Sequence, residues 1–146
     1  MIVLDAYPLA ALLAGEPAAT EVRELITNDP PFVPAPNLAE AIDLVGRTYG
    51  VEAQSARAAI ESLQESTDLK ILPVHERHAW RAAELRVTYY HRTRRPVSIA
   101  DCLLLAVTSS DDRVATADRH VLAVAHAEGI NWIALPDSKG QRHPPS

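Results

Sequence analysis

Four acidic residues are the candidates for chemistry in this chain: Asp5, Glu40, Asp101 and Asp118. Three of them directly follow a short apolar segment or lie in the first turn of the helix after one. Asp101 follows no such segment, but it also lies in the first turn of an expected helix. The carboxyl ends of parallel strands share one edge of a sheet, where binding sites form. If the helix of Asp101 starts at this edge, all four carboxylates converge.

Carboxylates that share one pocket repel one another and cannot all stay ionised at neutral pH without a counter-charge. A divalent cation supplies that charge. Oxygen ligands without a cysteine or histidine cluster suit Mg²⁺ or Mn²⁺ better than Zn²⁺. Such a cation lowers the pKa of a bound water and neutralises charge on a phosphate group. The predicted chemistry is therefore metal-assisted hydrolysis of a phosphoester.

Asp101 stands out because every other residue from Ile99 to Val107 is apolar. A helix that is apolar on all sides is buried, and an unpartnered buried aspartate is strongly unfavourable. We therefore expect a partner for Asp101: a bound cation, a bound proton or a basic side chain such as Arg94 or Arg95. Taken singly, each of the four acids also has an ordinary structural explanation as a helix cap or a first-turn acid.

Short apolar segments alternate with segments of helical periodicity. The expected strands are Ile2–Leu4, Phe32–Pro34, Leu69–Val74, Arg113–Thr116 and Ile130–Leu135. The expected helices are Pro8–Leu13, Ala18–Thr27, Leu38–Tyr49 with Asn37 as its N-cap, Val51–Ser66, Glu76–Tyr90, Ile99–Thr108 capped by Ser98, and Asp118–Glu128. This alternation indicates a parallel sheet covered on both faces. We predict an α/β fold, a three-layer α/β/α sandwich around a parallel sheet of four or five strands.

A chain of 146 residues, 47% hydrophobic and 23% charged, has the size and balance of one globular domain. We expect residues 1–135 to form it and the polar tail 136–146 to be frayed. The net charge of −5 argues against a protein that coats DNA, but leaves nucleic acid open as a substrate. Cys102 is the single cysteine, which excludes a disulfide framework. No apolar run reaches the ~18 residues of a membrane helix.

The acids lie in four short segments: Met1-Ile-Val-Leu-Asp5, Asn37-Leu-Ala-Glu40, Ser98-Ile-Ala-Asp101-Cys-Leu-Leu-Leu-Ala-Val-Thr108 and Ala115-Thr-Ala-Asp118-Arg. In order, spacing and apolar context, these segments resemble PIN-domain proteins, and more narrowly the VapC-type toxin ribonucleases of toxin–antitoxin pairs. The resemblance extends to about Leu135. It implies a PIN-like sandwich, an acidic pocket that holds Mg²⁺ or Mn²⁺, and endonucleolytic cleavage of RNA.

Residue by residue, the resemblance makes Asp5, Glu40, Asp101 and Asp118 the catalytic and metal-binding acids. Thr116 matches the hydroxyl residue that stands two positions before the fourth acid. The resemblance implies no organic cofactor and no membrane. Its expected partners are an RNA substrate, a cognate antitoxin protein and a second copy in a homodimer, and its expected location is the cytoplasm.

Two positions depart from the family pattern. Tyr7 replaces the serine or threonine that is common two residues after the first acid, so it is a candidate to fill or gate the pocket. His120 replaces an acid that is common in the family two residues after the fourth acid. Without that acid, the sequence gives less support for a second metal position.

A basic segment, His91–Arg95, precedes the Asp101 helix. Its three arginines, Arg92, Arg94 and Arg95, have two interpretations. They are either a solvated cationic helix end or a patch that contacts the RNA backbone.

Other functions compete with RNA cleavage. A PIN-like module that binds RNA or protein without turnover is the main alternative, and the presence of all four acids argues against it. A phosphatase needs a second aspartate where Tyr7 stands, and a phospho-receiver needs a lysine near the site, whereas the chain has only Lys70 and Lys139. The five glycines form no dinucleotide-binding loop.

Overall fold

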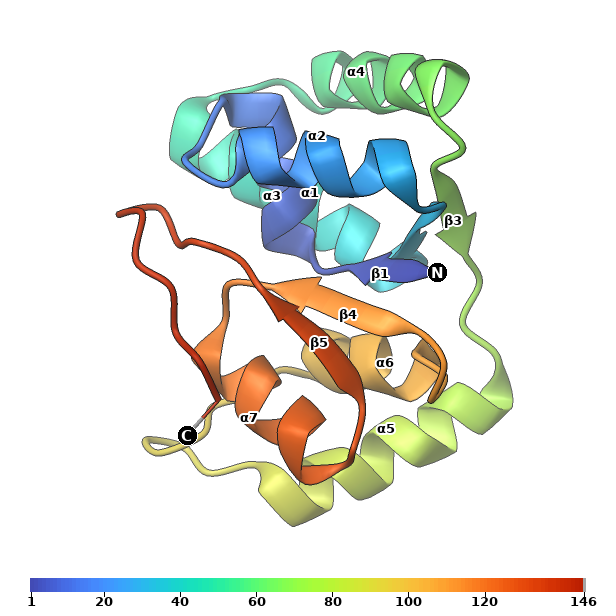
Figure 1. Ribbon diagram of the computed structural model, residues 1–146, viewed down its shortest axis with the longest axis vertical. Helices are drawn as coiled ribbons and strands as arrows, with labels where there is room; N and C mark the ends of the chain where they lie inside the picture. Colours follow the sequence, from blue (N-terminus) through green and yellow to red (C-terminus); the bar gives the residue numbers. More distant parts are fainter. Residues whose placement is uncertain (146) are drawn as a thin grey trace.

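The computed structural model describes residues 1–145, in which strands and helices alternate (Figure 1). The strands are β1 (Ile2–Leu4), β2 (Pro31–Pro34), β3 (Lys70–Leu72), β4 (Arg113–Thr116) and β5 (Asn131–Ala134). The helices are α1 (Ala6–Ala14), α2 (Ala19–Asn28), α3 (Ala35–Tyr49), α4 (Ala53–Ser66), α5 (Glu76–Tyr89), α6 (Ile99–Val107) and α7 (Arg119–Ala127). Within these residues, no helix is both long and apolar enough to cross a membrane.

The five strands form one parallel sheet in the order β3-β2-β1-β4-β5. β1 lies at its centre, where Leu4 pairs with Ala115 of β4 and Val3 pairs with Phe32 of β2. All three residues of β1 are fully buried, as expected for a strand covered on both faces. The predicted parallel sheet is confirmed, with five strands.

Helices cover the two faces of the sheet as separate layers (Figure 1). Side chains of a strand point alternately to opposite faces. Ile2 and Leu4 pack with residues of α1 and α2 in one hydrophobic cluster, whereas Val3 packs with residues of α5, α6 and α7 in another. The predicted three-layer α/β/α sandwich is therefore confirmed.

The start of α3 differs from the expectation. The sequence predicts Asn37 as the N-cap, but the helix begins two residues before it, at Ala35, and Pro34 occupies the cap position. Pro36 suits this first turn because a proline there loses no intrahelical hydrogen bond. Asn37 thus lies inside the first turn, fully buried, and its amide group is available for a role other than capping.

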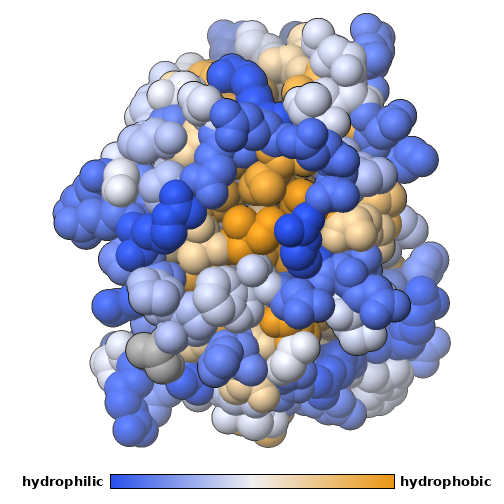
Figure 2. All heavy atoms as spheres, in the orientation of Figure 1, coloured by the Kyte–Doolittle hydropathy of each residue, from blue (hydrophilic) through white to orange (hydrophobic). Residues whose placement is uncertain are grey.

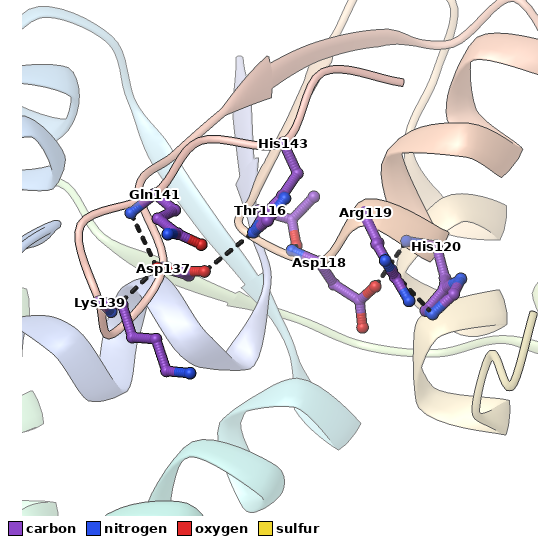
Figure 3. A network of polar contacts seen from close by, with 8 residues as sticks. All are labelled: Thr116, Asp118, Arg119, His120, Asp137, Lys139, Gln141 and His143. Atoms are coloured by element: carbon purple, nitrogen blue, oxygen red, sulfur yellow. Dashed lines mark hydrogen bonds and ion pairs between the residues drawn. The ribbon is translucent and has the colours of Figure 1, made fainter. Parts of the chain in front are cut away.

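The polar tail folds back instead of fraying. Asp137 closes a turn by accepting hydrogen bonds from the backbone N–H groups of Lys139 and Gln141, each at 2.9 Å (Figure 3). Arg142 forms an ion pair with Glu21 of α2 at 2.8 Å. These contacts hold the tail against α2 as far as residue 142, and Ser146 lies outside the described residues.

A matched pair of glycines tests the helix that carries Asn37 and Glu40 to the site. Gly50 ends α3 with a φ of +68°, a conformation that side chains disfavour, so Gly50→Ala should lower the free energy of unfolding by about 1 kcal/mol. Gly46 lies inside α3, where an added Cβ meets only the Val51 carbonyl at 3.4 Å. Gly46→Ala should raise the stability by up to about 1 kcal/mol. Urea denaturation measures both, and equal effects would contradict the assigned helix end.

Candidate metal centre

The site forms where β1 and β4, the central pair of strands, reach the carboxyl edge of the sheet. Asp5 follows β1 directly, and its N–H donates to the Ala115 carbonyl of β4 at 3.1 Å. Its side chain caps α1 by accepting from the Ala6 N–H at 2.6 Å. The capping explanation for Asp5 is therefore correct, but it accounts for only part of what this carboxylate does.

The Asp5 carboxylate is 5% exposed and is held by two further donors from distant parts of the chain. Thr116, at the end of β4, donates its hydroxyl to Oδ2 at 2.6 Å. Asn37 of α3 donates its amide to Oδ1 at 3.2 Å. Both side chains are fully buried. The predicted Thr116 therefore meets Asp5 directly, and its contact fixes the orientation of that carboxylate.

Three of the four predicted acids come together. One carboxylate oxygen each from Asp5, Glu40 and Asp101 lies within 4.8 Å of the other two. Glu40 is in the second turn of α3, and Asp101 is in the first turn of α6, so three separate helices contribute one ligand atom each. Such a set of hard oxygen donors matches the coordination that Mg²⁺ or Mn²⁺ prefers.

Asp101 is half-buried, and its helix is less enclosed than its composition suggests, because Ile99 is 53% exposed. The Asp101 carboxylate accepts the Ser98 N–H at 2.6 Å, and the Asp101 N–H donates to the Ser98 hydroxyl at 3.0 Å. This capping box confirms Ser98 as the N-cap of α6. Within residues 1–145, neither Arg94 nor Arg95 forms an ion pair with Asp101.

The electrostatics of the cluster show mutual repulsion. Burial, and then the charge of Asp101, raises the pKa of Asp5 to about 7. Burial followed by the same neighbour raises the pKa of Glu40. The pKa of Asp101 is raised by burial in spite of the hydrogen bonds from Ser98. The three carboxylates therefore need protons or a cation when they are close together.

Asp118, the fourth predicted acid, lies outside this three-acid group. It is exposed and caps α7 by accepting the His120 N–H at 2.6 Å (Figure 3). Its own N–H donates to the Thr116 hydroxyl at 3.0 Å. Its charge still contributes to the raised pKa values of Asp5 and Asp101, although burial is the larger cause. Asp118 is therefore a rim residue of the site.

Asn37 is a site residue that the sequence pattern did not reveal. Its amide nitrogen holds Asp5, while its Oδ1 is buried and has no hydrogen-bond donor within residues 1–145. A buried oxygen without a donor is unfavourable. Water bound to a cation at the neighbouring carboxylates would supply a donor, so this orphaned oxygen and the acidic ligand set both fit a hydrated divalent cation. The sequence signal that could have identified Asn37 as a site residue is its place three positions before Glu40 in an otherwise helical segment.

Tyr7 is partly buried and packs against the hydrophobic cluster of α1 and α2. Burial, followed by the charges of Glu16 and Asp137, raises its pKa to about 12. That Tyr7 fills or gates the acidic pocket stays a prediction.

The predicted basic residues lie in the loop between α5 and α6, which leads directly to the Asp101 capping box. An antiparallel bridge between His91 and Arg95 closes this loop. Arg95 lies over the Tyr89 ring, with its Cζ 5.6 Å from the centroid, while Arg92 and Arg94 are exposed. The arginines therefore belong to a structured loop next to the site in sequence, and not to a helix end.

Residues 2–142 match the model of one protein family, the PIN domain. The chain belongs to the PIN-domain family. Among curated proteins, no sequence matches this chain. All four acids lie within the matched residues, so the resemblance seen in the sequence is confirmed over nearly the whole chain.

Solved structures share this PIN-domain fold. VapC20 of Mycobacterium tuberculosis, described as a toxin that cleaves the sarcin–ricin loop, has a TM-score of 0.66 at 22% identity, over 89% of this chain and 96% of that chain. VapBC2 of Rickettsia felis, bound to a promoter DNA fragment, has a TM-score of 0.66 at 12% identity, over 92% and 99%. A toxin–antitoxin complex from Klebsiella pneumoniae has a TM-score of 0.61 at 15% identity, over 84% and 91%. At these identities the likeness establishes the fold.

The raised pKa of Asp5 makes the metal-free PIN domain sensitive to pH. The folded protein retains a proton on Asp5 up to about pH 7, whereas the unfolded chain releases it near 3.8. In EDTA, the contribution of Asp5 to the free energy of unfolding should therefore be largest below this interval and fall by roughly 1–4 kcal/mol as the pH rises across it. Asp5→Asn carries no charge at any pH and should remove much of this fall.

Urea denaturation as a function of pH measures the effect. Asp111→Asn, at an exposed position away from the cluster, is the matched control and should keep the parent's pH dependence. If Asp5→Asn lost stability with pH as steeply as the parent, Asp5 would not be the residue that titrates.

Proposed function

We propose that this chain is a Mg²⁺- or Mn²⁺-dependent endoribonuclease, the toxin of a type II toxin–antitoxin pair. The observation that carries the proposal is the group of Asp5, Glu40 and Asp101, whose carboxylate oxygens lie within 4.8 Å of one another in a PIN-domain chain. Catalysis belongs to residues 1–135, and residues 136–146 are a polar C-terminal tail.

The three inner carboxylates would hold the cation, and neighbouring residues orient two of those carboxylates. When bound, a divalent cation lowers the pKa of a coordinated water and offsets negative charge on a phosphodiester. Thr116 and Asn37 fix Asp5, and Ser98 fixes Asp101, so two of the three ligands have set orientations. The exposed carboxylate of Asp118 is the fourth acid, available at the rim to accept hydrogen bonds from water that enters the site.

RNA as the substrate is supported by the chemistry of the site and by the neighbouring loop. Metal-held carboxylates act on phosphoesters, and VapC20, which shares the fold, is described as cleaving the sarcin–ricin loop. Arg92, Arg94 and Arg95 supply local positive charge in a chain whose net charge is −5. Phosphate contacts of this kind position a nucleic acid without reading its sequence.

An antitoxin protein is the proposed partner. A hollow of about 560 Å³ between α3 and α4 is lined by Leu38, Ile42 and Ile60, with polar groups of α4 around them. On the face shown in Figure 2, apolar side chains also gather at the centre and are framed by hydrophilic ones. An amphipathic segment of a partner would cover such surfaces. A homodimer and a cytoplasmic location complete the proposal.

Substitution of the acids tests the catalytic proposal. Asp5→Asn and Asp101→Asn should each lower Mg²⁺- or Mn²⁺-dependent cleavage of a mixed single-stranded RNA by at least ~100-fold, because each loses a charged cation ligand. Gel-resolved initial rates of the purified chains measure the effect. Asp111→Asn, exposed and outside the cluster, should cleave at the parent's rate.

Thermal unfolding distinguishes loss of the cation from loss of the fold. A ligand that binds only the folded state stabilises it by mass action, so Mn²⁺ should raise the melting temperature of the parent and EDTA should reverse the rise. Both variants should have a metal-free melting temperature equal to or above the parent's, because each substitution relieves repulsion between the carboxylates, but both should lose this rise. A non-catalytic binding module would instead bind RNA without cleaving it, with or without the acids.

The arginines of the α5–α6 loop give a separate test. Replacing Arg92, Arg94 and Arg95 together with alanine should weaken RNA binding for all sequences and flatten its dependence on salt. Removing one phosphate-binding side chain reduces the slope of log K against log salt by about 0.7 for a single strand. Fluorescence anisotropy at several salt concentrations measures the slope, with Mn²⁺ affinity and melting temperature as controls. An unchanged slope would show that these arginines form only a solvated surface.

A further inference from the structure

Arg86 is a basic side chain on the helix that precedes the Asp101 helix and packs against it. It lies in the last turn of α5, and α5 and α6 pack closely as consecutive helices joined by the loop 90–98. This pairing places the end of α5 beside the start of α6, where Asp101 lies. Burial raises the pKa of Asp101, and the charge of Arg86 acts in the opposite direction, which agrees with their proximity.

The guanidinium of Arg86 is held in place without a carboxylate partner among the described residues. Its Cζ lies 4.0 Å from the centroid of the Tyr90 ring, one turn further along the chain. An arginine stacked on an aromatic face keeps its N–H groups free at the edges. Its Nε is buried and has no hydrogen-bond acceptor in the described part of the chain.

Some other arginines of the chain have a carboxylate partner. Five of the twelve form ion pairs with a carboxylate within residues 1–145: Arg47, Arg57, Arg81, Arg113 and Arg142. Arg86 is half-buried and adjacent to an acid, yet it forms no ion pair in these residues. Asp101 instead accepts its hydrogen bond from the Ser98 backbone.

The buried Nε shows that the guanidinium is partly desolvated, while its terminal Nη1 and Nη2 groups have no acceptor in residues 1–145 and are the donors that a ligand could use. The planar fork of arginine matches two oxygens of a phosphate group. In a site that acts on phosphodiesters, the partner with this geometry is the backbone of the substrate. Asp101 is not the partner of this guanidinium, because its carboxylate would bind the proposed cation.

We propose that Arg86 is a phosphate-binding residue of the nuclease site, contacting non-bridging oxygens of the RNA strand on the α5–α6 side of the three acids. This assignment rests on the proposed function. It adds a fixed, half-buried contact next to the reacting centre, distinct from the exposed arginines of the loop. Tyr90 acts as the positioning residue, because its ring sets the plane of the guanidinium.

Two variants at the same position test the assignment: Arg86→Gln, which removes the charge, and Arg86→Lys, which keeps it. Arg77→Gln makes the same charge change on the same helix at an exposed position and is the matched control. Binding of a short fluorescein-labelled single-stranded RNA is measured by anisotropy in an Asp5→Asn background, where the strand stays intact. Initial cleavage rates are measured without that background substitution.

Arg86→Gln should weaken RNA binding about tenfold or more, the size of a missing hydrogen bond to a charged group, and should lower the salt slope by about 0.7. Arg86→Lys should restore the salt slope and most of the affinity. Mn²⁺ affinity of the Arg86 variants with Asp5 intact, measured by electron paramagnetic resonance of free Mn²⁺, should stay within about twofold of the parent or become tighter. Arg77→Gln should bind RNA as the parent does.

Parent-like RNA affinity and salt slope in Arg86→Gln would overturn the assignment while leaving metal-dependent cleavage intact. Loss of melting temperature, Mn²⁺ affinity and RNA affinity together, without rescue by lysine, would also overturn it, because Arg86 would then be structural. A parent chain that neither binds nor cleaves the RNA with Mn²⁺ would instead contradict the proposed function, and the assignment with it.

Discussion

The burial of the Asp5 carboxylate is the constraint on which the rest of the site depends. A carboxylate that is 5% exposed is tolerable only if donors from the protein replace the water it has lost. The donors come from Ala6, from Asn37 and from Thr116, which is separated from Asp5 by 111 positions in the sequence. The sheet order makes this possible, because β1 lies at the centre and has β2 and β4 as its neighbours.

The fold that supplies hydrogen bonds to the Asp5 carboxylate also places two other carboxylates close enough to repel it. Glu40 and Asp101 enter the site from the two helix layers on opposite sides of the sheet, and their oxygens lie within 4.8 Å of an Asp5 oxygen. Two unit charges about 4 Å apart repel by roughly 4 kcal/mol at an effective dielectric constant of about 20. Folding alone therefore leaves the cluster with unfavourable energy that protonation or a cation relieves. Strain of this kind at a functional site is compensated by ordinary packing elsewhere, here by two apolar clusters on either face of the sheet.

The sequence predicted the sheet and the inner acids because both follow from local patterns. Short apolar segments in the sequence predicted all five strands. Asp5 directly follows one of these strands, and the helix that carries Glu40 follows another. Asp101 was found through its apolar helix, although Ile99 is exposed and that helix is only partly enclosed. Asn37 was missed because asparagine is also a common N-cap, and only the tertiary contact with Asp5 separates the two roles. Asp118 was predicted to join the other acids but lies outside the three-acid group. A residue after a strand can either face the site or cap the next helix, and Asp118 caps α7. Arg86 gave no local signal at all, because its position depends on how α5 and α6 pack.

The arrangement of charge would let an acidic chain bind the polyanionic substrate that we propose. The three inner acids converge at the edge of the sheet, while Arg86 lies in the last turn of α5 and the three loop arginines lie between α5 and α6. Screening at physiological salt acts over about 8 Å, so the strand responds to this local pattern and little to the net charge of −5. Without a cation, the phosphate nearest the three acids would be repelled, whereas with one it is attracted. Binding of the cation and of the strand are then coupled, and the coupling is reciprocal: if the cation tightens RNA binding by some factor, RNA tightens cation binding by the same factor. Under the proposed function, the buried like charges that make the metal-free site unfavourable would therefore couple binding of the metal to binding of the substrate.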